Sequence, residues 1–523
     1  MSIKLKLITA VMVLLTIMSC KENKIKEEIK KEVENSDYYK EQFRPQFHFT
    51  PEQKWMNDPN GLVYHNGVYH LFYQYYPEDI VWGPMHWGHA VSKDMIYWEH
   101  KPIALYPDEL GLIFSGSAVV DKDNTSGFGT LENPPLVAIF TYHDMEGEKS
   151  GKTDFQTQGI AYSLDNGDSW TKFSGNPVIG NDGIKDFRDP KVFWNDQANV
   201  WTMLLVAGDH LQIWNSANLK QWEKVSEFGK DKGAHGGVWE CPDMFKLKVE
   251  GTNEEKWVLL ISINPGAPNG GSGTQYFIGD FDGNKFATDQ KESEWLDWGT
   301  DNYAGVTYNN VPNGDRIFIG WMSNWAYARD TPTEKWRSAM TLPRTISLRK
   351  IGDEYVLINY PIKEFNAIVK TNLKKEIVLE PGALEELRYD HFNQAEVTFK
   401  TTSKAFRMKL KNSLDENLVL NFDAENQLIL LDRTQSGKID FQEDFGNHIQ
   451  QMPIDNLPDT EFEVRIILDH SSIEIFINKG QYVMTAQLFP NEQYNMLMIE
   501  NTSAGPLRLK DFGISKVTRI WED

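Results

Sequence analysis

The stretch GLVYHNGVYHLFYQYY, residues 61–76, is a strand-like run of aromatic and β-branched residues interrupted at Asn66 and Gly67. Comparable runs occur at residues 135–143, 200–208, 256–263 and 316–324. Gly, Pro, Asn and Asp separate these runs, and helical periodicity is almost absent between residues 44 and 345. This pattern predicts that residues 44–345 are all-β.

A weak internal repeat indicates how the strands are arranged. Three segments share Ser-x-[Asp/Asn] followed shortly by Trp, and they begin at Ser92, Ser163 and Ser216. The second segment looks like the Asp-box hairpin of several β-propellers. Hairpins that recur roughly every 50 to 70 residues indicate radially arranged sheets, and about 300 residues divide into roughly five blades. We therefore expect a five-bladed β-propeller whose blades these hairpins cap, rather than hairpins that bind a ligand.

After Arg344 the pattern changes to strict alternation. The apolar positions are Phe462, Val464, Ile466, Leu468, Ile473, Ile475 and Ile477, followed by a turn at residues 478–480. Alternation with polar residues pointing outward predicts a β-sandwich over residues 366–523. Residues 346–365 would then be a linker between the two domains.

The N-terminus has the features of a targeting segment. Lys4 and Lys6 precede an apolar run from Leu7 to Met18, which is too short to span a bilayer. The following Ser19-Cys20 resembles the end of a bacterial lipobox, so we expect a signal peptide at residues 1–19 and a lipid on Cys20, with simple secretion as the alternative. Residues 20–43 are highly charged and are predicted to be a solvated tether.

Composition narrows the class of partner. The chain has 523 residues, which suggests two or more domains, and a formal charge of −22. That charge argues against nucleic acid and against anionic lipid surfaces, so membrane contact is expected only through the N-terminal lipid. The 17 Trp, 20 Tyr and 28 Phe suit β structure and stacking on sugars. A neutral substrate fits best.

Three acids stand close before a proline at the start of a strand-like run. They are Asp58, Asp189 and Glu240. Comparable positions in successive propeller blades face one central funnel, so the three acids can meet there. A pair of carboxylates flanking an acetal carries out glycoside hydrolysis. Each acid alone also has an ordinary explanation: Asp58 as a turn residue, Asp189 as an ion-pair partner of Arg188, and Glu240 as a solvated strand end.

Eight motifs in order resemble those of glycoside hydrolase family 32, which contains invertases, inulinases and levanases. They are WMNDPNG (55–61), FYQ (72–74), WG (82–83), FSGS (114–117), FRDP (187–190), WECP (239–242), DWGTDNYA (297–304) and GWMSNW (320–325). SIEIFINKG (472–480) is similar to the sandwich domain of that family. The resemblance implies a five-bladed propeller followed by a sandwich, and cleavage of β-fructofuranosides with retention. It implies no cofactor and no metal.

The resemblance also implies residue roles. Asp58 would be the nucleophile, Glu240 the acid and base, and Asp189 the residue that holds two ring hydroxyls. Retention predicts that the carboxyl groups of Asp58 and Glu240 are about 5–5.5 Å apart. The fructose pocket would be lined by Trp55, Asn57, Gln74, Trp82, Phe114, Ser115, Arg188 and Trp321. Within WMNDPNG, residues 59–61 are expected to form a turn because Asp-Pro and Asn-Gly favour turns.

Residues 320–327 resemble the form of their motif in bacterial fructan-degrading members, so the leading hypothesis is an exo-acting enzyme on levan or inulin. The alternatives are a fructosyltransferase on the same scaffold, an inverting pentosidase on a related fold, and a lipoprotein that only captures fructan. Two other candidates have structural explanations. Cys241 is expected to be a small buried packing residue, and the acids at Asp121, Asp123 and Glu132 to belong to a turn rather than a calcium loop.

Overall fold

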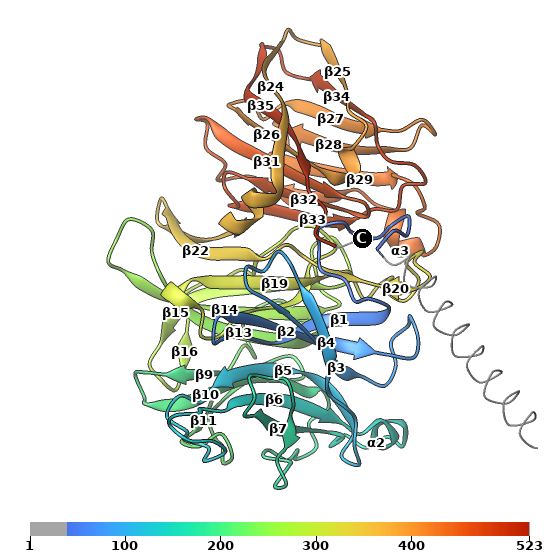
Figure 1. Ribbon diagram of the computed structural model, residues 1–523. Helices are drawn as coiled ribbons and strands as arrows, with labels where there is room; N and C mark the ends of the chain where they lie inside the picture. Colours follow the sequence, from blue (N-terminus) through green and yellow to red (C-terminus); the bar gives the residue numbers. More distant parts are fainter. Residues whose placement is uncertain (1–38, 522–523) are drawn as a thin grey trace, which may run out of the picture.

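The computed structural model describes residues 39–521. The predicted signal peptide, Cys20 and most of the charged tether lie outside the described residues. The described chain is built almost entirely of strands, which form seven sheets (Figure 1). Within residues 39–521, no helix is long and apolar enough to cross a membrane.

Five sheets make up the part of the chain before residue 362. The first contains β1 (Lys54–His65), β2 (Val68–Tyr76), β3 (His86–Ser92), β4 (Glu99–Leu105) and the short β20 (Trp336–Arg337). The second contains β5 (Leu112–Val120), β6 (Leu136–His143), β7 (Gln156–Ser163) and β8 (Thr171–Lys172), with helix α2 (Met145–Lys149) between β6 and β7. The third contains β9 (Phe187–Asn195), β10 (Val200–Ala207), β11 (Leu211–Ser216) and β12 (Glu223–Phe228).

The fourth and fifth sheets complete the set. The fourth contains β13 (Val238–Lys248), β14 (Glu255–Asn264), β15 (Gly273–Phe281), β16 (Phe286–Ala287) and β17 (Glu294–Trp295). The fifth contains β18 (Tyr303–Thr307), β19 (Arg316–Met322), β21 (Ala339–Met340), β22 (Arg344–Ile351) and β23 (Glu354–Pro361). The linker expected at residues 346–365 is therefore wrong for most of its length, because the β22–β23 hairpin belongs to the fifth sheet. The actual connection is the short 3-10 segment η2 (Lys363–Ile368).

The first strand of each of these five sheets lies at the centre of a closed ring. β1 contacts β5, β5 contacts β9, β9 contacts β13, β13 contacts β18, and β18 contacts β1 again. Such a ring of sheets is a β-propeller. The pairing of β20 with β1 joins the end of this region back to its beginning. The repeated Ser hairpins are structural, as predicted: Ser92, Ser163 and Ser216 each accept a main-chain N–H of the turn that joins the third and fourth strands of a sheet.

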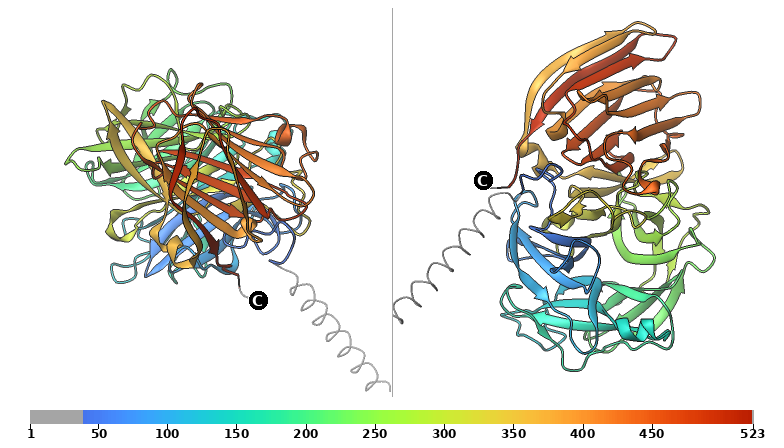
Figure 2. Two further views of the ribbon diagram at one scale, coloured as in Figure 1. Left: turned by 90° about the horizontal axis from the view of Figure 1, so that it is seen from above. Right: turned by 90° about the vertical axis from the view of Figure 1, so that its right-hand side faces the viewer.

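Residues after 368 form the predicted sandwich of two six-stranded sheets (Figure 2). One sheet contains β24 (Val369–Leu379), β35 (Leu507–Val517), β26 (Ala395–Thr401), β31 (Phe462–Asp469), β32 (Ser472–Ile477) and β33 (Tyr482–Gln487). The other contains β25 (Leu384–Arg388), β34 (Met496–Asn501), β27 (Phe406–Lys411), β28 (Asn417–Asp423), β29 (Leu428–Gln435) and β30 (Gln450–Pro453). The prediction of an all-β chain with a propeller followed by a sandwich is confirmed.

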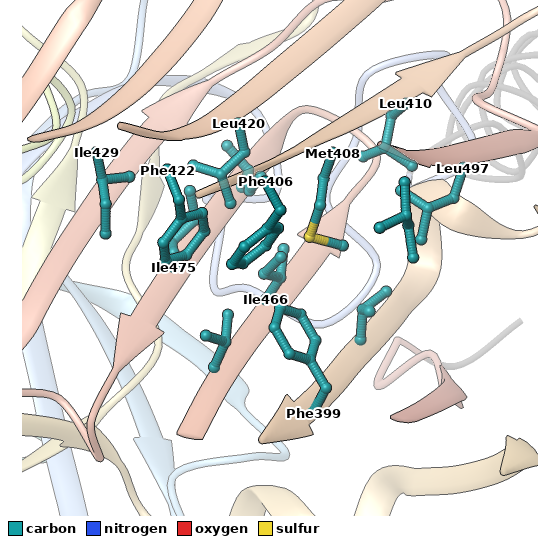
Figure 3. Packing of buried hydrophobic residues seen from close by; sticks show 14 of the residues in the cluster. Phe399, Phe406, Met408, Leu410, Leu420, Phe422, Ile429, Ile466, Ile475 and Leu497 are labelled. Carbon is teal, nitrogen blue, oxygen red and sulfur yellow. The ribbon is translucent and has the colours of Figure 1, made fainter. Parts of the chain in front are cut away.

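The sandwich core lies between the two sheets. Phe399, Phe406, Met408 and Ile466 point into it from facing strands (Figure 3). The alternating apolar positions of β31 and β32 all belong to this core, as expected. Each such side chain contributes about 1.5–3 kcal/mol when fully removed from water.

The opposite face of β31 and β32 is not solvated, contrary to the outward polar face expected from alternation. Asp469 and Glu474 are fully buried on that face, because it covers the propeller. Asp469 accepts hydrogen bonds from the main chain of Gln46 and Phe47 and contacts His48 Nδ1 at 2.7 Å. The sheet therefore carries polar side chains that bind the start of the propeller domain.

A second buried polar contact joins the two domains through acids of residues 297–304. Arg344 donates to Asp297 at 3.0 Å, and Asp297 accepts from the main chain and hydroxyl of Thr485 on β33. Arg433 on β29 donates to Asp301 at 2.8 Å. Breaking a buried ion pair by removing one partner typically costs about 3–5 kcal/mol. These contacts fix the sandwich against the propeller.

Candidate active site

The innermost strand of each propeller sheet has an irregularity in register near its start, at the same level of the ring. These β-bulges fall at residues 57–58 of β1, 114–115 of β5, 189–190 of β9, 241–242 of β13 and 304–305 of β18. A bulge inserts an extra residue and re-aims the neighbouring side chains. The Pro and Gly residues of the motifs explain the bulges locally, since proline cannot donate to the sheet ladder. All three acids lie at or beside a bulge.

The turn expected at residues 59–61 is instead part of β1. The strand runs without interruption from Lys54 to His65, with a second irregularity between Asn60 and Val63. Gly61 has a φ of +54° there, and a Cβ at this position would lie 2.7 Å from the ring of Phe72. Asn-Gly thus supplies the backbone freedom for a bulge, not for a hairpin end.

Asp58 is held by two side-chain donors. Ser115 Oγ, from the bulge of β5, donates to Asp58 Oδ2 at 2.6 Å. Asn57 Nδ2 donates to the other oxygen at 2.9 Å, and Asn57 is itself oriented by the indole N–H of Trp55. Both carboxylate oxygens of Asp58 therefore have fixed directions.

Asp189 and Asp58 both contact Cys241. The main-chain N–H of Cys241 donates to Asp189 Oδ2 at 3.0 Å, and the Cys241 sulfur lies 3.6 Å from the same oxygen. That sulfur also lies 3.5 Å from Asp58 Oδ2. Cys241 is buried, as expected, and its position beside two carboxyl groups makes it part of the site. Burial raises the pKa of the thiol well above its ordinary value, and Asp189 and Asp58 raise it further.

The backbone of this level is strained at three non-glycine residues. Asp189, Cys241 and Ala304 have φ values of 63°, 45° and 53°. Conformations of this kind cost about 1–3 kcal/mol each and cluster at functional sites. The strain lies where three adjacent sheets aim residues into the centre of the ring.

Glu240 has an arginine on one side and a tyrosine on the other. Arg188 donates to Glu240 Oε1 through Nε at 3.2 Å and through a terminal nitrogen at 3.0 Å. The Tyr303 hydroxyl donates to Glu240 Oε2. Burial raises the pKa of Glu240 above its ordinary value, although Arg188 and Tyr303 act in the opposite direction. Burial likewise raises the pKa of Asp189, with Arg188 opposing it.

The aromatic residues predicted for the pocket divide into two layers. Trp82 and Phe114 are half-buried with ring centroids 6.1 Å apart, and Phe114 stacks on His143 at 4.2 Å. Trp55 and Trp321 are fully buried, so they form the layer beneath the pocket surface and not the surface itself.

Gln74 also has a supporting position. Its side chain is buried and donates to the main-chain oxygen of Ile113, immediately before the bulge of β5. Gln74 therefore braces the strand that carries Phe114 and Ser115. The side-chain amide of Gln74 gives a hydrogen bond to the Ile113 carbonyl group, which lacks its usual partner because the bulge interrupts the sheet ladder.

Sequence reasoning missed several residues of this region. Tyr303 stands inside a quoted motif, but no spacing rule indicates that its hydroxyl reaches Glu240. The Asp186 carboxylate accepts a hydrogen bond from Arg188 at 2.8 Å. Arg329 lies 5.9 Å from the Trp82 ring and 5.7 Å from the Trp325 ring, so it joins two half-buried aromatic residues. The Tyr303–Glu240 and Arg329–Trp82 contacts join segments far apart in sequence, so only the fold reveals them.

Comparison with known proteins gives a consistent result. The N-terminal domain model of glycosyl hydrolases family 32 matches residues 48–361, and the C-terminal model of the same family matches residues 364–516. A levanase of Bacillus subtilis is 46% identical over 498 residues, covering 93% of this chain and 72% of the relative. An extracellular exo-inulinase of Aspergillus awamori is 42% identical, covering 87% of this chain and 90% of the relative.

The structural comparison agrees with the sequence comparison. The crystal structure of exo-inulinase from Aspergillus awamori superposes with a TM-score of 0.84 at 38% identity, and the match covers 92% of this chain and 100% of that one. A match that covers 92% of this chain includes both the propeller and the sandwich. The chain belongs to glycosyl hydrolase family 32.

Proposed function

We propose that this protein is a retaining, exo-acting β-fructofuranosidase that releases fructose from fructans by double displacement. The observation that carries the proposal is the convergence of Asp58, Asp189 and Glu240 at one level of the propeller ring. Relatives named levanase and exo-inulinase support a fructan as substrate and an attack on the chain end.

In the first displacement, an oxygen of Asp58 attacks the anomeric C2 of the terminal fructosyl unit. Glu240 donates its proton to the leaving oxygen as the bond from C2 breaks, which leaves a fructosyl group on Asp58. The raised pKa of Glu240 keeps a larger fraction of this carboxyl group protonated. Ser115 and Asn57 keep the Asp58 carboxylate in the direction of attack.

In the second displacement, water attacks the same carbon. Glu240, now a carboxylate, accepts the proton of that water, and the bond between C2 and Asp58 breaks. Two inversions give net retention. Asp189 accepts hydrogen bonds from ring hydroxyl groups. Arg188 keeps Glu240 in one orientation while Glu240 changes from the acid of the first displacement to the base of the second.

Digestion of levan, inulin and sucrose tests this proposal. Chromatography should show free fructose from the first minutes, without oligofructans as early products. NMR of the initial product should show the anomer that retains the configuration of the substrate. Oligofructans alone would rule out the exo assignment, transfer products at low sucrose would favour a fructosyltransferase, and an inverted product would exclude the mechanism.

We further infer that the protein is exported and carries a lipid on Cys20. The apolar run before Cys20 and the extracellular exo-inulinase relative support export. A Cys20→Ser variant is expected to leave the membrane fraction and lose incorporation of labelled fatty acid. Unchanged membrane association of that variant would contradict lipidation at this residue.

A further inference from the structure

A cavity of about 560 Å³ opens at the end of the propeller ring opposite the candidate active site. Its walls include Val120 at the end of β5, Asn195 at the end of β9 and Lys246 near the end of β13. Asp189 and Glu240 lie near the starts of β9 and β13, and Ser115, which donates to Asp58, lies in the first half of β5. The cavity shares no lining residue with the active site, and its volume is within the range of about 300–1,000 Å³ for small-ligand sites.

A buried polar layer separates the two ends of the ring. Lys191 donates to the main-chain oxygen of Thr307 at 2.6 Å and pairs with Asp243 at 3.2 Å. Asn309 donates to main-chain oxygens of Ala118 and Val192 at 2.8 and 3.1 Å. These side chains fill the centre of the ring by joining its inner strands. A ligand in the cavity would therefore not reach the carboxyl groups of the active site.

The cavity wall is aromatic and keeps unused hydrogen-bond donors. Phe193, Trp194 and Trp257 are half-buried, with the Phe193 and Trp257 rings 5.9 Å apart. In the described part of the chain, the indole N–H groups of these two Trp residues have no hydrogen-bond acceptor. Among the described residues, the guanidinium of Arg316 forms no close ion pair; it is attracted by the charge of Asp243 and lies over the ring of Phe245, 5.6 Å away.

The charges of the wall favour an uncharged ligand. The acids that line the cavity are Asp121, Asp123 and Asp196, and the bases are Lys122, Lys246 and Arg316. Three of each give a formal sum of zero, whereas the whole chain carries −22. Aromatic faces beside free donors suit a sugar, whose C–H face stacks while its hydroxyl groups accept hydrogen bonds.

We propose that this cavity is a second, non-catalytic binding site for a neutral oligosaccharide, and that it holds a segment of the same fructan polymer on which the active site acts. The identity of the polymer rests on the proposed function. Holding a polymer at two places raises its effective concentration at the catalytic end without any change in the chemistry. Short substrates cannot reach both ends and gain nothing from the second site.

The test uses a double variant of the wall, Trp194→Ala with Trp257→Ala. The KM for levan or inulin should rise by about 3- to 10-fold, because loss of stacking groups weakens the second contact. The kcat and KM for sucrose should stay at their wild-type values. Trp222→Ala is the matched control, since Trp222 is half-buried beside a hairpin and does not line the cavity.

Binding without turnover separates this inference from the proposed function. In gels that contain levan or inulin, an Asp58→Ala variant should be retarded, and adding the two Trp substitutions should abolish most of the retardation. Equal retardation with and without those substitutions would overturn the cavity site. A change of oligomeric state caused by the two substitutions would also overturn it, because the cavity would then hold a second copy of the chain. If the wild-type protein is retarded but hydrolyses no fructan, the proposed function fails while the binding site stands.

Discussion

The sulfur of Cys241 lies 3.5 Å from Asp58 Oδ2. Asp189 approaches the same sulfur at 3.6 Å, so the thiol stands between two carboxyl groups. A thiolate there would be repelled by both, which agrees with the raised pKa of Cys241. The residue serves as a small neutral spacer whose main-chain N–H orients Asp189.

This environment predicts an inert thiol. Alkylation of Cys241 by iodoacetamide at pH 8 should be at least about 100-fold slower in the native protein than in the unfolded chain, because the thiolate is the reactive form. Cys241→Ser should keep activity within about 10-fold, since the spacer remains small and neutral. Cys241→Asp should lose nearly all activity without unfolding. Rapid native alkylation would contradict the assigned environment.

Tyr303 donates to Glu240 and thereby opposes the effect of burial on its pKa. In Tyr303→Phe the pKa of Glu240 should rise further. Glu240 must be protonated in the first step, so the alkaline limb of the kcat/KM profile should move to higher pH. Tyr308→Phe is the control, because Tyr308 is equally buried but its hydroxyl has no partner within the described residues. An unshifted alkaline limb in Tyr303→Phe would exclude Glu240 as the acid.

Ser115 and Ser117 lie two residues apart on β5, and substituting each one should affect a different property, catalysis for Ser115 and stability for Ser117. Ser115 donates to Asp58, whereas Ser117 donates to the main-chain oxygen of Pro190 and accepts from Val192. Ser115→Ala should lower kcat by about 10- to 100-fold, the value of a hydrogen bond to a charged group. Ser117→Ala should instead lower Tm, with little change in kcat. The two assays should therefore give opposite rankings of the variants.

The fold class and the three acids could be predicted from the sequence, because strand composition and acids near prolines are local signals. The bulges could not, since Asp58-Pro59 and Asn60-Gly61 favour a turn and a bulge equally. The hairpin at residues 344–361 could not be assigned to the propeller from sequence, because its role depends on pairing with β19. The burial of the face that carries Glu474 could not be predicted for the same reason. Alternation distinguishes the two faces of a strand, but it does not show which part of the molecule covers the second face.

His48 lies at the domain junction beside Asp469 and Glu474, at 2.7 and 3.5 Å. Burial alone would lower its pKa, but the hydrogen bond to Asp469 and the nearby carboxylate of Glu474 raise it to about 9. The stabilisation is fully present below pH about 6.5, where the unfolded state also binds the proton, and is lost as pH rises through about 9. Its size is on the order of 3 kcal/mol.

Denaturant unfolding between pH 6 and 10 measures this contribution. The wild type should lose free energy of unfolding across that window, and His48→Gln should lose much less. Parallel pH curves for the two proteins would mean that His48 is not charged in the native state.

The central claim is that Asp58 and Glu240 divide the work of a double displacement. In Glu240→Gln, an activated fructoside whose leaving group needs no proton should still react with Asp58, while the second step lacks its base. Mass spectrometry after rapid acid quenching should then find one fructosyl group on the peptide that contains Asp58. An adduct on another residue, or turnover without any adduct, would contradict the account.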